Sequence, residues 1–147
     1  MRAGCRGWQA GLVHRDEVMR WVAGYERAWR DGDLDAVAGL FTDDARYRPS
    51  PYEPAEVGHA AIQAFWLDDE GETFAVRADP VAVEGRQAVV RLEVRYGDPV
   101  RREYRDLWVL GFAADGRVED FEEWAYWPGK SYSAGAPTRP DTVYARA

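Results

Sequence analysis

The hydrophobic pattern of this 147-residue chain changes its period halfway along, and this change limits the fold more than any other feature. In the first half, apolar residues recur at helical spacing in three segments: 18–29, 33–41 and 58–66. In the second half, apolar and polar residues alternate in four segments joined by short turns: 74–83, 87–96, 102–112 and 118–126. Helices followed by an antiparallel meander predict an α+β domain.

Local signals place the ends of these segments. Asp16 is a candidate N-cap for the first helix, and Gly32 is a candidate stop. Asp33 is the candidate cap of the second helix, and Gly58 precedes the third. Residues 45–48 are predicted to form a brief strand that ends at a proline-rich turn. We expect a loose extension at 1–13, one domain at 14–127 and an irregular tail at 128–147.

Composition excludes several classes of function. The net charge is −7, and arginines are mixed with acids, so we expect no nucleic-acid partner. No segment approaches the length of an apolar membrane span, so we expect no membrane partner and a cytoplasmic location. Cys5 is the single cysteine, and the two histidines, His14 and His59, are far apart in the sequence. We therefore expect neither a metal site nor a cofactor.

Four short motifs occur in an order and spacing that are fairly specific for one fold: GDLD at 32–35, LFTDDA at 40–45, GH at 58–59 with FW at 65–66, and DGRV at 115–118. Over residues 15–127 this order resembles the nuclear transport factor 2-like superfamily, and within it the SnoaL-like and ketosteroid-isomerase branch. The resemblance implies a cone in which three N-terminal helices pack on a curved antiparallel sheet and enclose a pocket for a small molecule. It also implies a homodimer, for which we expect the outer sheet face with Arg91, Glu93 and Arg95 to be the interface.

The resemblance allows the isomerase's functional positions to be compared with this chain. Its oxyanion tyrosine on the first helix matches Tyr25, but its base aspartate falls on Pro49 and its second acid falls on Trp108. Proline cannot accept a proton, and an indole cannot replace a neutral carboxylic acid. The chain is therefore not a standard ketosteroid isomerase.

Strand alternation selects residues for the concave face independently of any family. Val90 and Leu92 belong to the apolar set of their strand, and Asp106 is the one acid in the set that also contains Trp108. The isomerase's register turns Glu123 inward on the last strand. If residues 113–116 form the turn, Asp106 lies directly opposite Glu123, with Cβ atoms about 5 Å apart.

Two carboxyl groups in a dry pocket cannot both stay ionised, so we expect one to have a raised pKa and the pair to share a proton. Such a pair gives one proton while taking another, as isomerisation, dehydration or aldol cyclisation requires. Tyr25 is the candidate donor to an oxyanion. The candidate ligand-binding residues are Trp29, Tyr47, Trp66, Val90, Leu92, Trp108 and Phe121.

The same residues allow other interpretations. The acids belong to a structural ion-pair network if Arg48 or Arg105 reaches them, and a slip of one residue would turn Glu122 inward instead of Glu123. The inward rings are also what an ordinary core requires. A non-catalytic binding module is then the second hypothesis. Epoxide-hydrolase-like activation of water is the third, and it requires Arg91 to face the pocket.

Overall fold

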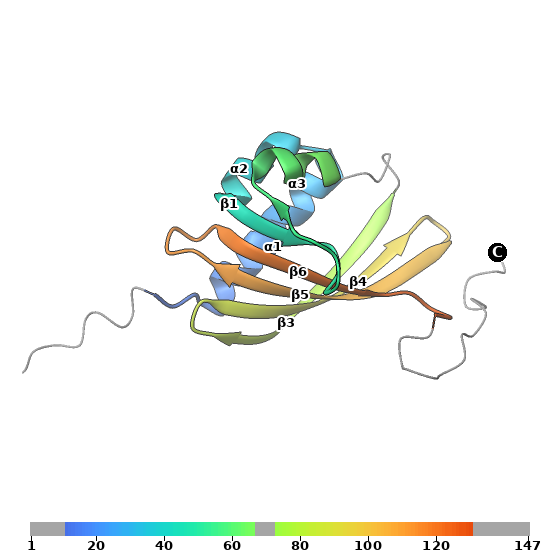
Figure 1. Cartoon of the computed structure of the whole chain (residues 1–147). Helices are drawn as coiled ribbons and strands as arrows, with labels where there is room; N and C mark the ends of the chain where they lie inside the picture. The colour runs from blue at the N-terminus through green and yellow to red at the C-terminus, as the bar shows by residue number, and fades with distance from the viewer. Residues whose placement is uncertain (1–10, 67–72, 131–147) are drawn as a thin grey trace, which may run out of the picture.

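The computed structural model describes residues 11–66 and 73–130, which form one curved sheet with helices against it (Figure 1). Its helical elements are α1 (Arg15–Asp31), η1 (Leu34–Ala36), α2 (Val37–Leu40) and α3 (His59–Phe65). Its strands are β1 (Phe41–Arg48), β2 (Glu56–Val57), β3 (Phe74–Glu84), β4 (Gln87–Tyr96), β5 (Arg102–Phe112) and β6 (Val118–Tyr126). The strand order is β2-β1-β6-β5-β4-β3, and β1 pairs with β6 in parallel while the other pairs are antiparallel. The predicted α+β class is confirmed.

Helix α1 supplies the apolar stripe that covers the sheet. Its buried side chains follow helical spacing: Val18, Trp21, Val22, Tyr25, Ala28 and Trp29. Gly32 ends the helix in the left-handed region, at φ 63°, as predicted. The predicted N-cap is wrong, because His14 holds that position. Asp16 lies in the first turn instead, where its carboxylate faces the positive end of the helix dipole.

The segment after α1 differs from its prediction. Asp33 accepts a hydrogen bond from the backbone N–H of Asp35, at 3.1 Å, but it caps a short 3-10 turn and not a longer helix. Helix α2 ends at Leu40, and Phe41 already begins β1. This strand is longer than the predicted 45–48 because it pairs with β6, which lies far away in the sequence.

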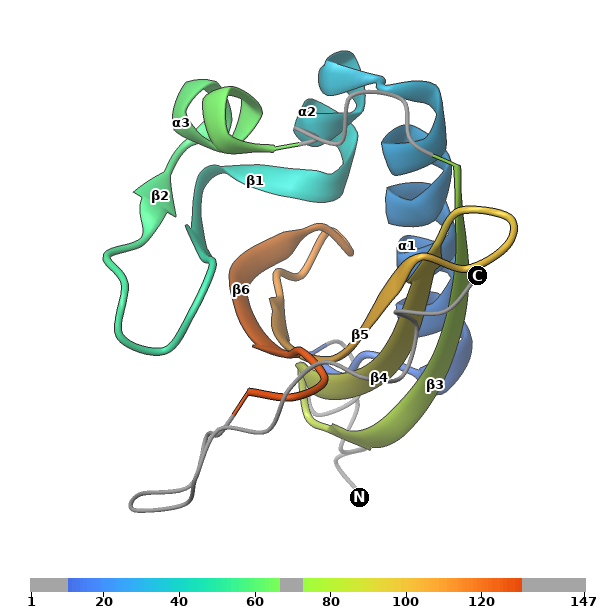
Figure 2. The ribbon, with the colours of Figure 1, turned by 90° about the vertical axis from the view of Figure 1, so that its right-hand side faces the viewer.

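The strand side chains alternate between the two faces of the sheet, as predicted, and the sheet curves around its concave face (Figure 2). On β4, Val90, Leu92 and Val94 are buried on the concave side, while Arg91 is exposed on the other. On β5 the buried set runs from Tyr104 to Phe112 in steps of two. Helix α1 lies on the concave side, where the Tyr25 and Trp108 ring centroids are 4.6 Å apart.

The predicted register between β5 and β6 is wrong by two residues. The backbone N–H of Ala113 bonds to the carbonyl of Arg117, and a β-bulge follows between the pairs of Phe112 and Gly111. Phe112 lies opposite Val118 and not Arg117, which shifts the pairing by one residue, and the bulge shifts every later pairing by one more. Asp106 therefore lies opposite Ala125, and Trp108 lies opposite Glu123. The two acids are diagonal neighbours on the same face.

The first described residues belong to the domain. Val13 is buried, and its backbone N–H donates to the carbonyl of Gly85 at 2.9 Å. The rest of the predicted extension, apart from residues 11–12, lies outside the described residues, as does most of the predicted tail. Within the described ranges, no helix has both the length and the apolar character that a membrane crossing needs.

Candidate functional site

The concave side holds a dense group of aromatic rings centred on Tyr25 and Phe121. Their rings stack at 5.8 Å, and Trp66 lies 5.0 Å from Tyr25. Trp29 stacks on Phe74 at 4.2 Å. Every side chain predicted to bind a ligand is less than a tenth exposed: Trp29, Tyr47, Trp66, Val90, Leu92, Trp108 and Phe121. The rings touch one another as an ordinary core does, and their binding role stays a prediction.

Asp106 is the buried acid of this face. It is 2% exposed, and its Oδ2 accepts a hydrogen bond from Trp108 Nε1 at 2.9 Å. Its Oδ1 is also buried, and no N–H or O–H group of the described residues donates to it. If the carboxyl group were ionised, burying Oδ1 without a hydrogen-bond donor would cost free energy. If it is protonated on Oδ1, this oxygen carries a hydrogen and can act as a donor.

The electrostatics of Asp106 agree with a protonated carboxyl. Burial is the main cause that raises its pKa, to about 10, and a hydrogen bond and the charge of Glu123 add to the effect. The hydrogen bonds from Trp108 and from the backbone of Trp124 act in the opposite direction but do not outweigh burial. Burial and the nearby charge of Glu123 therefore favour the neutral form of the Asp106 carboxyl.

Glu123 is the glutamate that faces inward. It is half-buried, and Tyr47 Oη donates to its Oε2 at 3.5 Å. Glu122 points to the outer face, where it pairs with Arg48 at 3.0 Å. Arg105 lies near Glu93 at 3.8 Å, also on the outer face. Both arginines that the ion-pair interpretation required are thus engaged with other acids.

The Tyr25 hydroxyl has protein partners. Trp66 Nε1 donates to it at 2.6 Å, and it lies 3.3 Å from the Tyr47 hydroxyl. Burial raises the pKa of both tyrosines above the ordinary value, so both hydroxyls keep their protons. The sequence indicated Tyr25 but not this link to Tyr47, since that link depends on how α1 lies against β1 in the folded chain.

Arg91 is exposed, and its neighbours Val90 and Leu92 are fully buried on the opposite face. The Arg-x-acid arrangement of Arg91 and Glu93 is therefore not part of the concave face. The third hypothesis required Arg91 in the pocket, so water activation by this route is excluded. In residues 11–66 and 73–130, no three His, Cys, Asp or Glu side chains gather as a metal site requires.

Comparison with known proteins places this geometry in a family. The family model of the SnoaL-like domain matches residues 20–121, well over half of the chain. The chain belongs to this family. No curated protein matches it significantly.

Solved structures similar to the SnoaL-like domain carry the same fold. A putative SnoaL-like polyketide cyclase from Jannaschia sp. CCS1 has a TM-score of 0.62 and 22% identity, covering 75% of this chain and 85% of its own. An LEH-like epoxide hydrolase from M. tuberculosis has a TM-score of 0.60 and 18% identity, covering 76% and 84%. An NTF-2 like protein of unknown function from Burkholderia xenovorans LB400 has a TM-score of 0.61 and 19% identity, covering 79% of this chain and 88% of its own. At such identities the likeness shows the fold, that of the nuclear transport factor 2-like superfamily, but not the activity.

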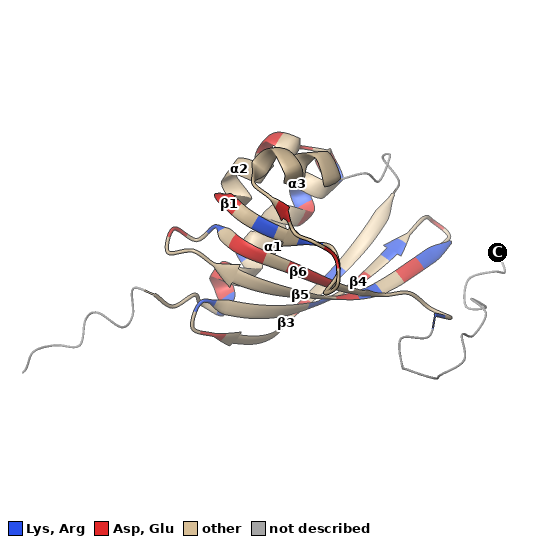
Figure 3. Ribbon diagram, viewed as in Figure 1, with Lys and Arg blue, Asp and Glu red and all other residues tan. Residues whose placement is uncertain are grey.

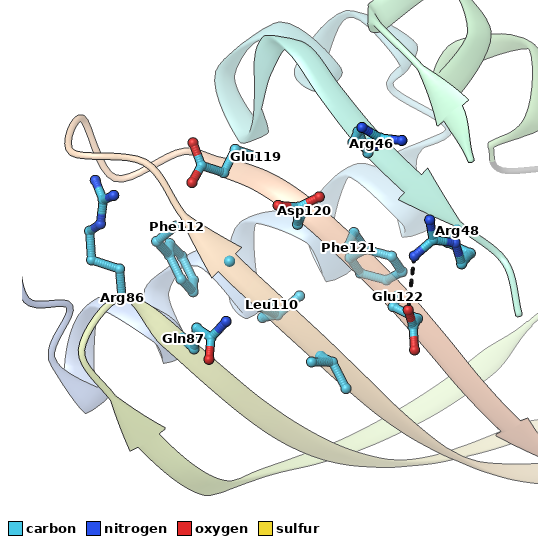
Figure 4. A pocket seen from close by; sticks show the side chains of 12 residues that line it. Arg46, Arg48, Arg86, Gln87, Leu110, Phe112, Glu119, Asp120, Phe121 and Glu122 are labelled. Atoms are coloured by element: carbon cyan, nitrogen blue, oxygen red, sulfur yellow. Dashed lines mark hydrogen bonds and ion pairs between the residues drawn. The ribbon is translucent and has the colours of Figure 1, made fainter. Parts of the chain in front are cut away.

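The described part of the SnoaL-like domain has a hollow at one end of the sheet and a groove on its outer face. A hollow of about 270 Å³ lies at the ends of β5 and β6, beside Tyr104 and Trp127, whose rings are 4.6 Å apart. Tyr104 is the next inward residue after Asp106. A groove of about 460 Å³ crosses the outer face of the sheet (Figure 4). Charges of both signs are interspersed over the strands (Figure 3).

The outer groove is lined by equal numbers of positively and negatively charged side chains. Gly111 is among its lining residues and has no side chain that could fill it. Arg86 lies at one end and Arg46 near the other, with acids between them (Figure 4). Three arginines and three acids line the groove: Arg46, Arg48, Arg86, Glu119, Asp120 and Glu122.

Proposed function

We propose that this SnoaL-like domain is a cofactor-free acid/base enzyme that acts on a small, mostly apolar molecule with a carbonyl group. The carboxyl pair on the concave face carries the proposal. Asp106 is buried with a raised pKa that favours its neutral form, and half-buried Glu123 on the same face adds to that shift. Pairs of acids whose surroundings separate their pKa values mark the acid and the base of such reactions.

The geometry supports one division of roles. Glu123, the more accessible acid, would take a proton from the carbon beside the carbonyl group. Asp106 would supply a proton to the oxygen, either directly or through Glu123, and the hydrogen bond between them would return the pair to its starting state. Tyr25 would have to exchange its Tyr47 partner for the substrate oxygen to act as an oxyanion donor. Isomerisation, dehydration and cyclisation all begin with this proton transfer, and one similar structure is named as a polyketide cyclase.

Glu123→Gln is expected to abolish proton transfer with little change in ligand affinity. Glutamine keeps the shape and the acceptor for Tyr47 but cannot take a proton. We expect a loss of about 10²–10⁴-fold in the exchange of α-protons with D₂O, followed by NMR on a panel of small cyclic ketones that includes 3-cyclohexenone. Asp106→Asn should show a loss in the same range.

Glu122→Gln is the matched control, because it removes the neighbouring glutamate on the outer face. It should exchange protons within about twofold of the parent. A chain that binds members of the panel but exchanges none of their protons would instead be a binding module. The close packing of the concave rings is the observation that favours this second candidate.

We also propose that the protein partner is a second copy of this chain, docked on the outer groove. A chain of net charge −7 repels its copies, but the groove carries equal numbers of positive and negative side chains. Apolar side chains continue beside it, since Val109, Trp124 and Tyr126 are 37–42% exposed on the outer faces of β5 and β6. A surface with both signs and an apolar ridge can complement itself across a two-fold axis.

Arg86→Glu is expected to weaken this dimer at least tenfold in analytical ultracentrifugation, because it unbalances the groove. Arg91→Glu is the matched control, since Arg91 is an exposed arginine two strands from β6. An unchanged dimer in Arg86→Glu, with a weakened one in Arg91→Glu, would instead place the interface on the β4 surface with Arg91, Glu93 and Arg95, as the family resemblance implies. A monomer at all concentrations would contradict the dimer itself.

A further inference from the structure

A chain of three hydrogen bonds ends on Glu123, and the proposed mechanism does not yet use it. It begins at Trp66 Nε1, which donates to Tyr25 Oη at 2.6 Å. The Tyr25 and Tyr47 hydroxyls are 3.3 Å apart, and Tyr47 Oη lies 3.5 Å from Glu123 Oε2. The links join the residue that caps the end of α3 to α1, β1 and β6, so only the folded chain assembles them.

The direction of each link follows from the number of protons available. A carboxylate oxygen can only accept, so the single proton of Tyr47 points to Glu123. The Tyr47 oxygen must then accept from Tyr25, whose own oxygen accepts from the Trp66 indole. Every donor therefore points toward the same carboxylate.

Burial keeps the chain of donors in this state. Tyr25, Tyr47 and Trp66 are each 5% exposed or less, so water competes little for their polar atoms. Hydrogen bonds in such surroundings are stronger than in water and polarise one another. A donor directed at one carboxylate favours the charge on that carboxylate.

We infer that Tyr47 is a positioning residue that holds the negative charge of the acid pair on Glu123, with Tyr25 and Trp66 aligning its hydroxyl. The inference deepens the proposed function and rests on it for its catalytic meaning. It assigns the role of general base to Glu123 and the role of proton donor to Asp106. Ionisation of Asp106 in place of Glu123 would leave the Tyr47 proton without a charged acceptor.

The titratable groups near Glu123 come from three elements. Tyr25 lies on α1, Tyr47 on β1, and Asp106 and Tyr104 on β5, and each senses the charge of Glu123. The tyrosines stay neutral because burial raises their pKa. Arg48 is the nearby cation on β1, and it pairs with Glu122 on the other face. The Tyr47 hydroxyl donates to Glu123, and Asp106 and the tyrosines lie within range of its charge.

The test is Tyr47→Phe, studied by carboxyl ¹³C NMR titration of the whole chain. Losing the donor should move the Glu123 titration midpoint upward by about one pH unit. Tyr25→Phe leaves the Tyr47 hydroxyl in place and should move the midpoint by less than half as much. Because each change removes one oxygen atom, the ¹H–¹⁵N spectrum should report the parent fold.

A folded Tyr47→Phe variant with an unchanged Glu123 titration would overturn the inference, and so would a larger shift in Tyr25→Phe. The acid limb of the pH–rate profile for ketone exchange should move with the midpoint. If the midpoint moves but no ketone exchanges in the parent protein, the proposed function fails and the positioning role stands. If Glu123→Gln stops exchange while Tyr47→Phe leaves the titration unchanged, only the positioning role fails.

Discussion

In the parent protein we expect the free energy of unfolding to decrease as pH rises, and in Asp106→Asn we expect a much smaller decrease. Burial raises the pKa of Asp106 to about 10 in the folded chain, against about 3.9 when unfolded. Folding therefore takes up a proton between these values, and the free energy of unfolding falls as pH rises, by about 1.4 kcal/mol per pH unit. The contribution of the neutral acid is complete below pH 4 and is lost as pH rises toward 10.

Asparagine stays neutral at every pH and keeps an oxygen for the Trp108 N–H. The variant should therefore gain about 4 kcal/mol relative to the parent between pH 5 and pH 8. Urea unfolding at pH 5, 6, 7 and 8 measures the difference directly. The two curves should converge near pH 4, where Asp106 is protonated in both states.

Asp120→Asn is the control for removing a carboxylate, because Asp120 is exposed in the outer groove. Its stability curve should run parallel to that of the parent. A parallel curve for Asp106→Asn as well would mean that Asp106 is ionised in the folded protein. The neutral acid of the proposed mechanism would then be lost.

Phe121→Ala is expected to lower the free energy of unfolding by about 3–5 kcal/mol. Phe121 is 2% exposed, and its ring stacks on Tyr47 at 4.5 Å and lies 5.2 Å from Trp108. Truncation leaves a cavity between helix α1 and the sheet that rigid rings cannot fill. Since domains have about 5–15 kcal/mol of stability, this loss is a large fraction of the total.

Tyr52→Ala provides the comparison, because Tyr52 is fully exposed. Its effect on urea unfolding should stay within about 0.5 kcal/mol. A Phe121→Ala loss below about 1 kcal/mol would show that the concave rings repack freely. In that event the rings would not form the rigid wall that the acid pair needs.

Much of the site could be predicted because alternation is a local property. Strands β4 and β5 have the predicted bounds, and Asp106 lies on the concave face as expected. Glu123 also faces inward, although the argument for its register was wrong. The turn and the bulge together moved it from opposite Asp106 to opposite Trp108, and across this diagonal its charge still raises the pKa of Asp106.

The sequence by itself determined the family, the helix that covers the sheet and the face on which each strand residue lies. These depend on periodicity and on residue order, which neighbours in the chain set. Only the tertiary structure decided the register of β6, the parallel pairing of β1 with it and the hydrogen-bond chain through Tyr47. A bulge and a pairing between distant strands depend on how the whole chain closes, because their free energy comes from contacts that no short segment contains.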